Sequence, residues 1–178
     1  MLRILFASAA IALAPLPALA SPEAEALIAG AAAEITDPVK GEDAFTRSID
    51  VAAVARFALG KHVRTVSAAE QDRFTAALRD FLADTFRDNA DKFRDARIEV
   101  LGSKDRSPTD SVVETRISQK GEDPMTVRWR VIAREGEWRV VDVEVLGLWL
   151  AIEQRAQIGA ILDRPRATID DAIAALTS

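Results

Sequence analysis

The sequence predicts an α+β fold, in which helices pack on one face of a curved four-stranded antiparallel sheet. Apolar residues recur every three or four positions up to about residue 96, and they alternate with polar residues from 98 to about 145. Helical spacing then returns from about Leu148. Helices, then strands, then helices indicate one α+β domain.

The first twenty residues, MLRILFASAAIALAPLPALA, have the pattern of a secretory signal peptide. One cation at Arg3 precedes an apolar run, and small residues follow it. Two prolines interrupt the run before it reaches the roughly 20 apolar residues that a membrane span requires. We therefore expect a signal peptide over 1–20 that is cleaved before Ser21, a single domain over 21–178, and export to the periplasm.

A short helix and a linker begin the mature chain. Helical spacing of apolar residues extends from Pro22 to Ile35 and ends at Asp37-Pro38. The residues from there to about Phe45 are mostly polar, and we expect them to form a linker.

Two more helices precede the strands. The first starts at Asp50, whose carboxylate can cap the free amides of the first turn, and it stops at Gly60 with Phe57 turned inward. The second starts with a capping box between Ser67 and Glu70. This second helix places several phenylalanines at helical spacing, so we expect one of its faces to be strongly apolar.

Four strands in a meander follow, and the register of the last hairpin can be argued from its side chains. A turn at Glu135-Gly136 needs one bulge near Val140-Val141 to keep the apolar residues of both strands on one face. Arg130 then lies opposite Asp142, and Arg128 lies opposite Glu144. The chain ends with a helix from about Leu148 to Leu162 and a short amphipathic helix that Thr168 and Asp171 begin.

The two faces of this hairpin differ in kind. Asp142 and Glu144 could form a metal site or an acid/base pair, but we favour ion pairs with the facing arginines on an exposed face. The other face forms an apolar wall opposite the phenylalanine-rich helix, and it is either ordinary core or the wall of a ligand cavity. The wall consists of Val127, Trp129, Val131, Ala133, Trp138, Val143 and Val145.

Composition excludes several chemistries. The chain has no cysteine, one histidine and a net charge of −5. Disulfides and thiolate metal sites are therefore excluded, and the acidity argues against a nucleic-acid binder. His62 lies among cations without a G-x-S-x-G motif, and no phosphate-binding glycine motif is present. We expect no metal, no cofactor and no catalytic residue.

The motifs in the middle of the chain resemble those of the MlaC family. They begin with ARFALGK at 55–61, Arg64 and SAAEQ at 67–71. They continue with FLADTF at 81–86, VRW at 127–129, GEWRVVDV at 136–143, and Gly147 with Arg155. The resemblance covers roughly residues 45 to 163 in the usual order. This family comprises periplasmic phospholipid-binding proteins of the maintenance-of-lipid-asymmetry pathway, also called toluene-tolerance auxiliary proteins.

The resemblance implies a non-enzymatic carrier that holds a glycerophospholipid by its acyl chains. It further implies transfer between an outer-membrane lipoprotein-porin complex and an inner-membrane ABC transporter complex with its lipid-binding subunit, so the lipid is cargo. It also implies that the helices and the curved sheet enclose an apolar pocket, and we expect the tails to lie there, between the sheet and the phenylalanine-rich helix. The wall residues are Leu78, Phe81, Leu82 and Phe86 of the helix, Val127, Trp129, Val131, Val143 and Val145 of the sheet, and Leu148 and Trp149 in the cavity or at its mouth.

Two alternatives remain at this point. One is an enzyme on a cone-shaped α+β fold that uses His62 or a buried carboxylate as a general base. The other is a structural adaptor for envelope proteins.

Overall fold

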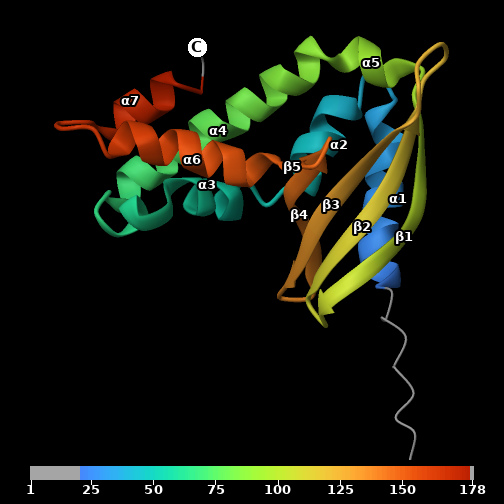
Figure 1. The fold of residues 1–178 in the computed structure, drawn as a ribbon, viewed down its shortest axis with the longest axis horizontal. Helices are drawn as coiled ribbons and strands as arrows, with labels where there is room; N and C mark the ends of the chain where they lie inside the picture. The colour runs from blue at the N-terminus through green and yellow to red at the C-terminus, as the bar shows by residue number, and fades with distance from the viewer. Residues whose placement is uncertain (1–20, 177–178) are drawn as a thin grey trace, which may run out of the picture.

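The computed structural model describes residues 21–176, and Figure 1 shows their arrangement. The expected signal peptide over 1–20 lies outside the described residues. The helices are α1 (Pro22–Ile35), α2 (Gly41–Ser48), α3 (Val51–Leu59), α4 (Ala68–Asp88), α5 (Ala90–Arg94), α6 (Leu150–Leu162) and α7 (Ile169–Ala174). The strands are β1 (Arg97–Ser107), β2 (Asp110–Ser118), β3 (Met125–Arg134), β4 (Glu137–Val145) and β5 (Leu148–Trp149). The α+β prediction is confirmed.

The strands form one antiparallel sheet in the order β1-β2-β3-β4-β5. The fifth strand, which the sequence did not predict, is a two-residue return of the chain against the end of β4. The predicted bulge is confirmed, because the register shifts between Arg130 and Val131 on β3. Arg130 therefore pairs with Asp142, and Arg128 pairs with Glu144.

The predicted helix caps are present. The Asp50 carboxylate accepts a hydrogen bond from the Ala53 backbone nitrogen at 2.9 Å at the start of α3. Ser67 and Glu70 form a capping box at α4, and Thr168 and Asp171 form one at α7. These caps fix the entry of each helix independently of the sheet.

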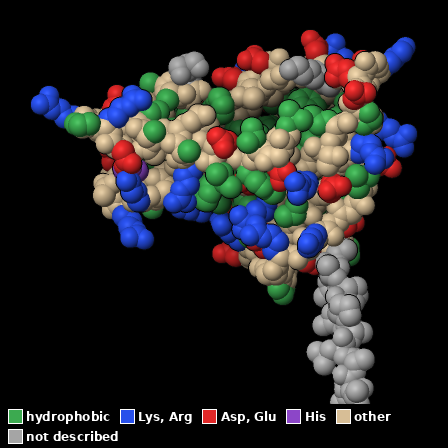
Figure 2. All heavy atoms as spheres, in the orientation of Figure 1, with side chains coloured by type: hydrophobic (Ala, Val, Ile, Leu, Met, Phe, Trp, Pro, Cys, Tyr) green, Lys and Arg blue, Asp and Glu red, His purple; other side chains and the backbone are tan. Residues whose placement is uncertain are grey.

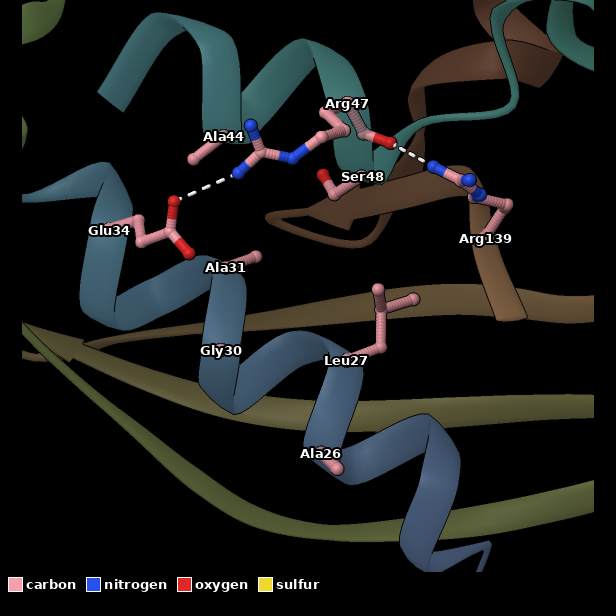
Figure 3. A pocket seen from close by; sticks show the side chains of 9 residues that line it. All are labelled: Ala26, Leu27, Gly30, Ala31, Glu34, Ala44, Arg47, Ser48 and Arg139. Carbon is pink, nitrogen blue, oxygen red and sulfur yellow. Dashed lines mark hydrogen bonds and ion pairs between the residues drawn. The ribbon is translucent and has the colours of Figure 1, made fainter. Parts of the chain in front are cut away.

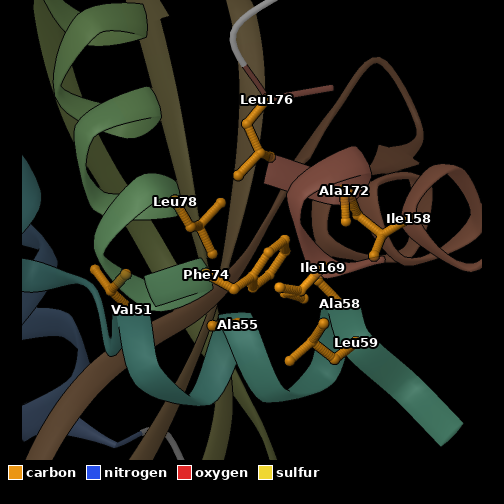
Figure 4. Close-up of a cluster of buried hydrophobic side chains, with 10 residues drawn as sticks. All are labelled: Val51, Ala55, Ala58, Leu59, Phe74, Leu78, Ile158, Ile169, Ala172 and Leu176. Carbon is orange, nitrogen blue, oxygen red and sulfur yellow. The ribbon is translucent and has the colours of Figure 1, made fainter. Parts of the chain in front are cut away.

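Four helices form a group of their own beside the edge of the sheet. Helices α3, α4, α6 and α7 pack together, and α3 and α6 contact β4 (Figure 1). Their buried side chains meet in one cluster, which Figure 4 shows around Phe74. The helical cluster consists of Val51, Ala55, Ala58, Leu59, Phe74, Leu78, Ile158, Ile169, Ala172 and Leu176.

Helix α1 covers the apolar face of the sheet. It contacts strands β1 to β4, and Figure 1 places it along one face of the sheet. Ala24 and Ile28 of α1 are buried against Val113, Val131 and Val140. The expectation that the phenylalanine-rich helix faces this wall is therefore wrong, since α4 packs mainly on α2, α3 and α7. Small alanine side chains let α1 approach the sheet closely.

Two further expectations need correction. The residues before Phe45 do not form only a linker, because α2 begins at Gly41 and buries Ala44. Phe57 is not buried: 38% of its surface is exposed, and the Arg155 guanidinium lies over its ring at 4.9 Å from the centroid. Helix α3 instead buries Val51, Ala55, Ala58 and Leu59 against its neighbours, and a cation–π contact covers the Phe57 ring.

Candidate functional site

An apolar cleft lies between α1 and the sheet, and it is the first part of the candidate site. Its lining is almost entirely hydrocarbon, with Ser48 as the exception. The cleft is lined by Ile28, Ala31, Ala32, Ile35, Ser48, Ile98, Trp129 and Val140. Its volume is only about 10 Å³, so the two walls are nearly in contact. Any large ligand must therefore move α1 or the side chains beneath it.

Trp129 supplies the aromatic wall of this cleft, and its indole N–H is hydrogen-bonded within the sheet. Its indole Nε1–H donates to the Thr115 hydroxyl at 2.9 Å, and that hydroxyl donates to the Val127 carbonyl oxygen at 3.2 Å. Thr115 is fully buried. Sequence reasoning missed Thr115, although its inward position on β2, two residues after Val113, was a signal that could have identified it.

A stack of three phenylalanines closes one end of the cleft. The rings of Phe45 and Phe86 are 5.2 Å apart between centroids, and those of Phe86 and Phe93 are 5.5 Å apart. The stack packs with Ile35 and Ile98, which also line the cleft. The cleft and the phenylalanine stack therefore form one continuous apolar surface, to which α1, α2, α4, α5 and β1 contribute.

An open cavity of about 680 Å³ lies beyond the stack, at the end of the sheet where β2 ends and β3 begins. Phe93 belongs to the stack and also lines this cavity, together with Ile117, Met125 and Leu146. The charged residues Glu122, Asp123, Arg128 and Glu144 also line it. Its size is in the range of about 300–1,000 Å³ that is typical of small-molecule sites. Figure 2 shows hydrophobic side chains gathered in a hollow below α4 and α5.

The outer side of α1 is held by charged contacts rather than by apolar packing. Figure 3 shows Arg47 of α2 reaching Glu34 of α1, with 2.9 Å between Nη2 and Oε2. Arg139 of β4 donates to the Arg47 carbonyl oxygen on the other side of the same helix. These bonds connect the C-terminal half of α1 to α2, and α2 to the sheet.

The charged face of the hairpin is not as exposed as the sequence suggested. Asp142 and Glu144 are only 9% and 5% exposed, because the chain returns through β5 into α6 next to this face. Glu144 forms the expected ion pair with Arg128. Arg130 instead binds Asp110 through two nitrogens, at 2.8 and 3.1 Å.

Asp142 acts as an anchor for the start of α6. Its Oδ1 accepts hydrogen bonds from the backbone nitrogens of Val143 and Ala151, both at 2.8 Å. Burial raises the pKa of Asp142, while the two amide hydrogen bonds and the nearby Arg130 oppose that rise. The expected pairing of Asp142 with Arg130 is thus right in register, but the carboxylate hydrogen-bonds the backbone.

The structure separates the expected wall residues into groups. Leu78, Phe81 and Leu82 belong to the helical cluster or pack against it, and Phe86 belongs to the phenylalanine stack. Val127 and Val131 are buried on the inner face of the sheet, and Val143 is half-buried there beside Trp129. The paired Val145 and Leu148 lie at the end of the sheet.

Trp149 lies on the opposite face of the sheet from Trp129. It pairs with Glu144 and lines a different cavity, of about 530 Å³, with Val112, Glu114 and Arg128. It therefore does not share the α1 cleft. Leu148 is 56% exposed, and three other apolar side chains of the same segment are at least half exposed: Leu146, Leu150 and Ile152.

His62 is engaged in an ion-pair cluster at the surface. Its Nε2 lies 3.0 Å from Oδ1 of Asp163, and the Lys61 ammonium lies 2.7 Å from the same oxygen. Lys61, and then His62, lower the pKa of Asp163. Between residues 21 and 176, no group of three or more His, Cys, Asp or Glu side chains is placed to hold a metal ion. In the described part of the chain, no helix is long and apolar enough to cross a membrane.

Comparison with known proteins gives two results. A family model described as MlaC protein matches residues 25–178. The fold resembles that of a phospholipid-binding protein from Ralstonia solanacearum, solved in complex with a phospholipid, with a TM-score of 0.74 and 18% sequence identity. The match covers 87% of this chain and 95% of that protein. No curated protein matches the chain significantly.

Proposed function

The chain belongs to the MlaC family, and from this premise we propose that it is a non-enzymatic phospholipid carrier of the periplasm. It takes up a glycerophospholipid by its acyl chains and carries it between an inner-membrane ABC transporter complex and an outer-membrane lipoprotein-porin complex. The observation that supports this proposal best is the continuous apolar lining from Trp129, past the phenylalanine stack, to the open cavity at Phe93.

The chemistry of the cargo explains why a carrier needs such a lining. Two acyl chains expose about 30 methylenes, and at roughly 0.8 kcal/mol each a bare lipid in water would cost more than 20 kcal/mol. The cleft and the stack offer hydrocarbon and aromatic carbon, and the indole N–H of Trp129 is already satisfied by Thr115. The charged residues that line the open cavity, among them Arg128 and Glu122, would accommodate the polar head group.

Loading requires the cleft to widen. Its volume of about 10 Å³ is smaller than a single acyl chain, so α1 has to move away from the sheet or the Phe86 ring has to rotate. We infer that α1 moves, because two of the four residues by which it lines the cleft are the small Ala31 and Ala32. Small side chains interlock little with the opposite wall, so their separation disrupts few contacts.

The proposal is tested by organic extraction of the protein purified after export, followed by mass spectrometry. We expect phospholipid in near-stoichiometric amount. A consistent absence of lipid, or the release of a hydrolysed product, would instead favour an adaptor or an enzyme that uses His62 or a buried carboxylate.

Two tryptophans provide matched variants for the same assay. Trp129→Ala should lose most of the lipid, and Trp129→Phe should retain it. Trp149→Ala removes the same side chain from the opposite face of the sheet, so it should keep the wild-type lipid load. Equal loss in the two alanine variants would place the tails elsewhere.

A further inference from the structure

Ser21, immediately before α1, is held on the sheet by both its backbone and its side chain. Its backbone nitrogen donates to the Ser103 hydroxyl at 3.1 Å, and its own hydroxyl donates to Oδ1 of Asp105 at 2.7 Å. The residue is only 7% exposed. The position at which we expect the mature chain to begin is therefore an ordered contact with β1.

Two carboxylates lie next to this contact without a cation. Asp105 accepts from the Ser21 hydroxyl, and Glu25 accepts from the Ser103 hydroxyl at 2.7 Å. Among the side chains that the structure describes, no lysine, arginine or histidine forms an ion pair with either carboxylate. The hydroxyls of Ser21 and Ser103 thus donate to two carboxylates, and neither carboxylate has a cationic partner among the described side chains.

We propose that this network is the binding site for the mature α-amino group, and that leader cleavage thereby fastens α1 onto the sheet. Hydrolysis of the Ala20–Ser21 peptide bond consumes one water and leaves a carboxylate on Ala20. The amine on Ser21 takes up a proton at neutral pH. The resulting ammonium has three N–H donors, and it supplies the positive charge that Asp105 and Glu25 lack. The proposal rests on the expected cleavage position.

The electrostatics of the helix make these carboxylates necessary. The N-terminus of α1, a helix of 14 residues, carries a partial positive charge, so an ammonium placed there is repelled. Asp105 from the sheet and Glu25 from the first turn of α1 offset that repulsion. An uncleaved chain has an uncharged amide nitrogen with one N–H at the same position, so it cannot form this ion pair.

The consequence concerns the helix that covers the cleft. Glu34 binds Arg47 near the C-terminal end of α1, and the ammonium of Ser21 fixes the opposite end. Cleavage therefore converts α1 from a helix with one charged attachment into a helix with two. Ala31 and Ala32, which line the cleft, lie between these two attachments, so the attachments limit how far α1 can separate from the sheet.

A double-mutant cycle tests the proposal on the purified mature protein. The first change of the cycle is a Gly-Ser extension before Ser21, which converts the α-amine of Ser21 into a peptide nitrogen. The second change is the pair of substitutions Asp105→Asn and Glu25→Gln, which removes both negative charges. We expect the extension to lower Tm by about 3–8 °C in the wild type, as for loss of a charge-assisted hydrogen bond in a domain of this size. The extension should leave Tm almost unchanged in the variant in which both carboxylates have been replaced by amides.

Control measurements make the outcome specific. Asp123→Asn neutralises a carboxylate in the β2–β3 loop, away from Ser21, so the extension should lower Tm in that variant as much as in the wild type. Hydrogen exchange should become faster in α1 and remain unchanged in α4. An equal effect of the extension in every background, or no effect in any, would overturn the proposal.

Intact mass spectrometry of the exported protein tests the underlying assumption separately. A mass that begins at Ser21 supports the ammonium site. A mass that begins at another residue removes the amine from this network and overturns the proposal, while leaving the lipid assay unaffected.

Discussion

The indole of Trp129 and the hydroxyl of Thr115 form a hydrogen bond of 2.9 Å that links β3 to β2 beneath the apolar cleft. The Thr115 hydroxyl also donates to the Val127 carbonyl oxygen, so it acts both as a hydrogen-bond acceptor and as a donor. This bond fixes the plane of the indole ring and turns its carbon edge toward α1. A polar residue that no sequence motif marks thus determines the shape of the apolar wall.

Thr115→Val should destabilise the protein by about 1–3 kcal/mol, because it leaves the Trp129 N–H without its acceptor. Thr115→Ser keeps the hydroxyl and should cost much less. Urea denaturation followed by tryptophan fluorescence measures both variants. Equal losses for valine and serine would show that the bond contributes little.

Phe86 and Leu78 lie on the same helix but in different clusters. Phe86→Ala should cost about 3–5 kcal/mol of stability and Leu78→Ala about 2–5 kcal/mol, since both side chains are buried. Only Phe86→Ala should reduce the lipid extracted per folded molecule, because only Phe86 contacts the cleft lining. An equal reduction of the extracted lipid for Leu78→Ala would indicate that the helical cluster also contacts the lipid.

Gly41 and Gly30 give a matched test of the packing beside the stack. A Cβ on Gly41 would lie 2.5 Å from the Ile35 carbonyl oxygen and 3.0 Å from the Phe86 ring, whereas a Cβ on Gly30 meets nothing within 4 Å. Gly41→Ala should therefore cost about 1–3 kcal/mol and displace the stack. Gly30→Ala should stabilise α1 by up to about 1 kcal/mol. Thermal denaturation of the two variants checks the contrast, and a neutral Gly41→Ala would contradict it.

Asp142 should make stability depend on pH in the direction opposite to most carboxylates. Its pKa is raised in the folded state, so its stabilising contribution is complete below the ordinary value of 3.8 and is lost as the pH rises through the folded pKa. Asp142→Asn keeps an acceptor for the Ala151 amide and removes this loss. Relative to wild type, the variant should gain stability as the pH rises above 3.8, where the Asp142 carboxyl ionises in the unfolded chain before it does so in the folded protein, and denaturation at a series of pH values measures this gain.

Asp142→Leu separates the role of the hydrogen bond from that of the charge. It leaves the amide of Ala151 without a partner and should cost about 1–3 kcal/mol at any pH. If the leucine and asparagine variants were equally stable at neutral pH, the anchoring role of the carboxylate would be refuted.

His62→Ala should leave the extracted lipid unchanged, because His62 lies in a surface ion-pair cluster with Asp163 and Lys61. Mass spectrometry of the purified variant measures this. Asp163→Ala, which removes the centre of the cluster, provides the control. Loss of lipid or of a hydrolytic activity in His62→Ala would support the enzyme hypothesis.

Local sequence features predicted the hairpin and the caps well. Opposite charges and matching apolar residues on β3 and β4 are compatible with only one register, which requires a bulge at Val141 on β4, opposite Arg130 and Val131. Asp50 and Ser67 carry their capping chemistry within four residues of sequence. Each of these features depends on neighbours along the chain or directly across a hairpin.

The choice of partner for each apolar face could not be predicted in the same way. Periodicity showed that the sheet and α4 each have an apolar face, but it could not show that α1 covers the sheet while α4 packs with α3 and α7. The phenylalanine at position 86 was expected on the wall, whereas the stacking partner Phe45 lay in a predicted linker. Long-range packing of small residues leaves no periodic signal that identifies its partner.

The near-closure of the cleft has a kinetic consequence. If opening of α1 precedes entry of the acyl chains, the rate of uptake should rise with the concentration of donor lipid and then reach a plateau. The plateau would equal the opening rate of the helix, on the microsecond-to-second range of such motions. The close packing of α1 on the wall that includes Trp129 would thus also set how quickly one molecule can be reloaded.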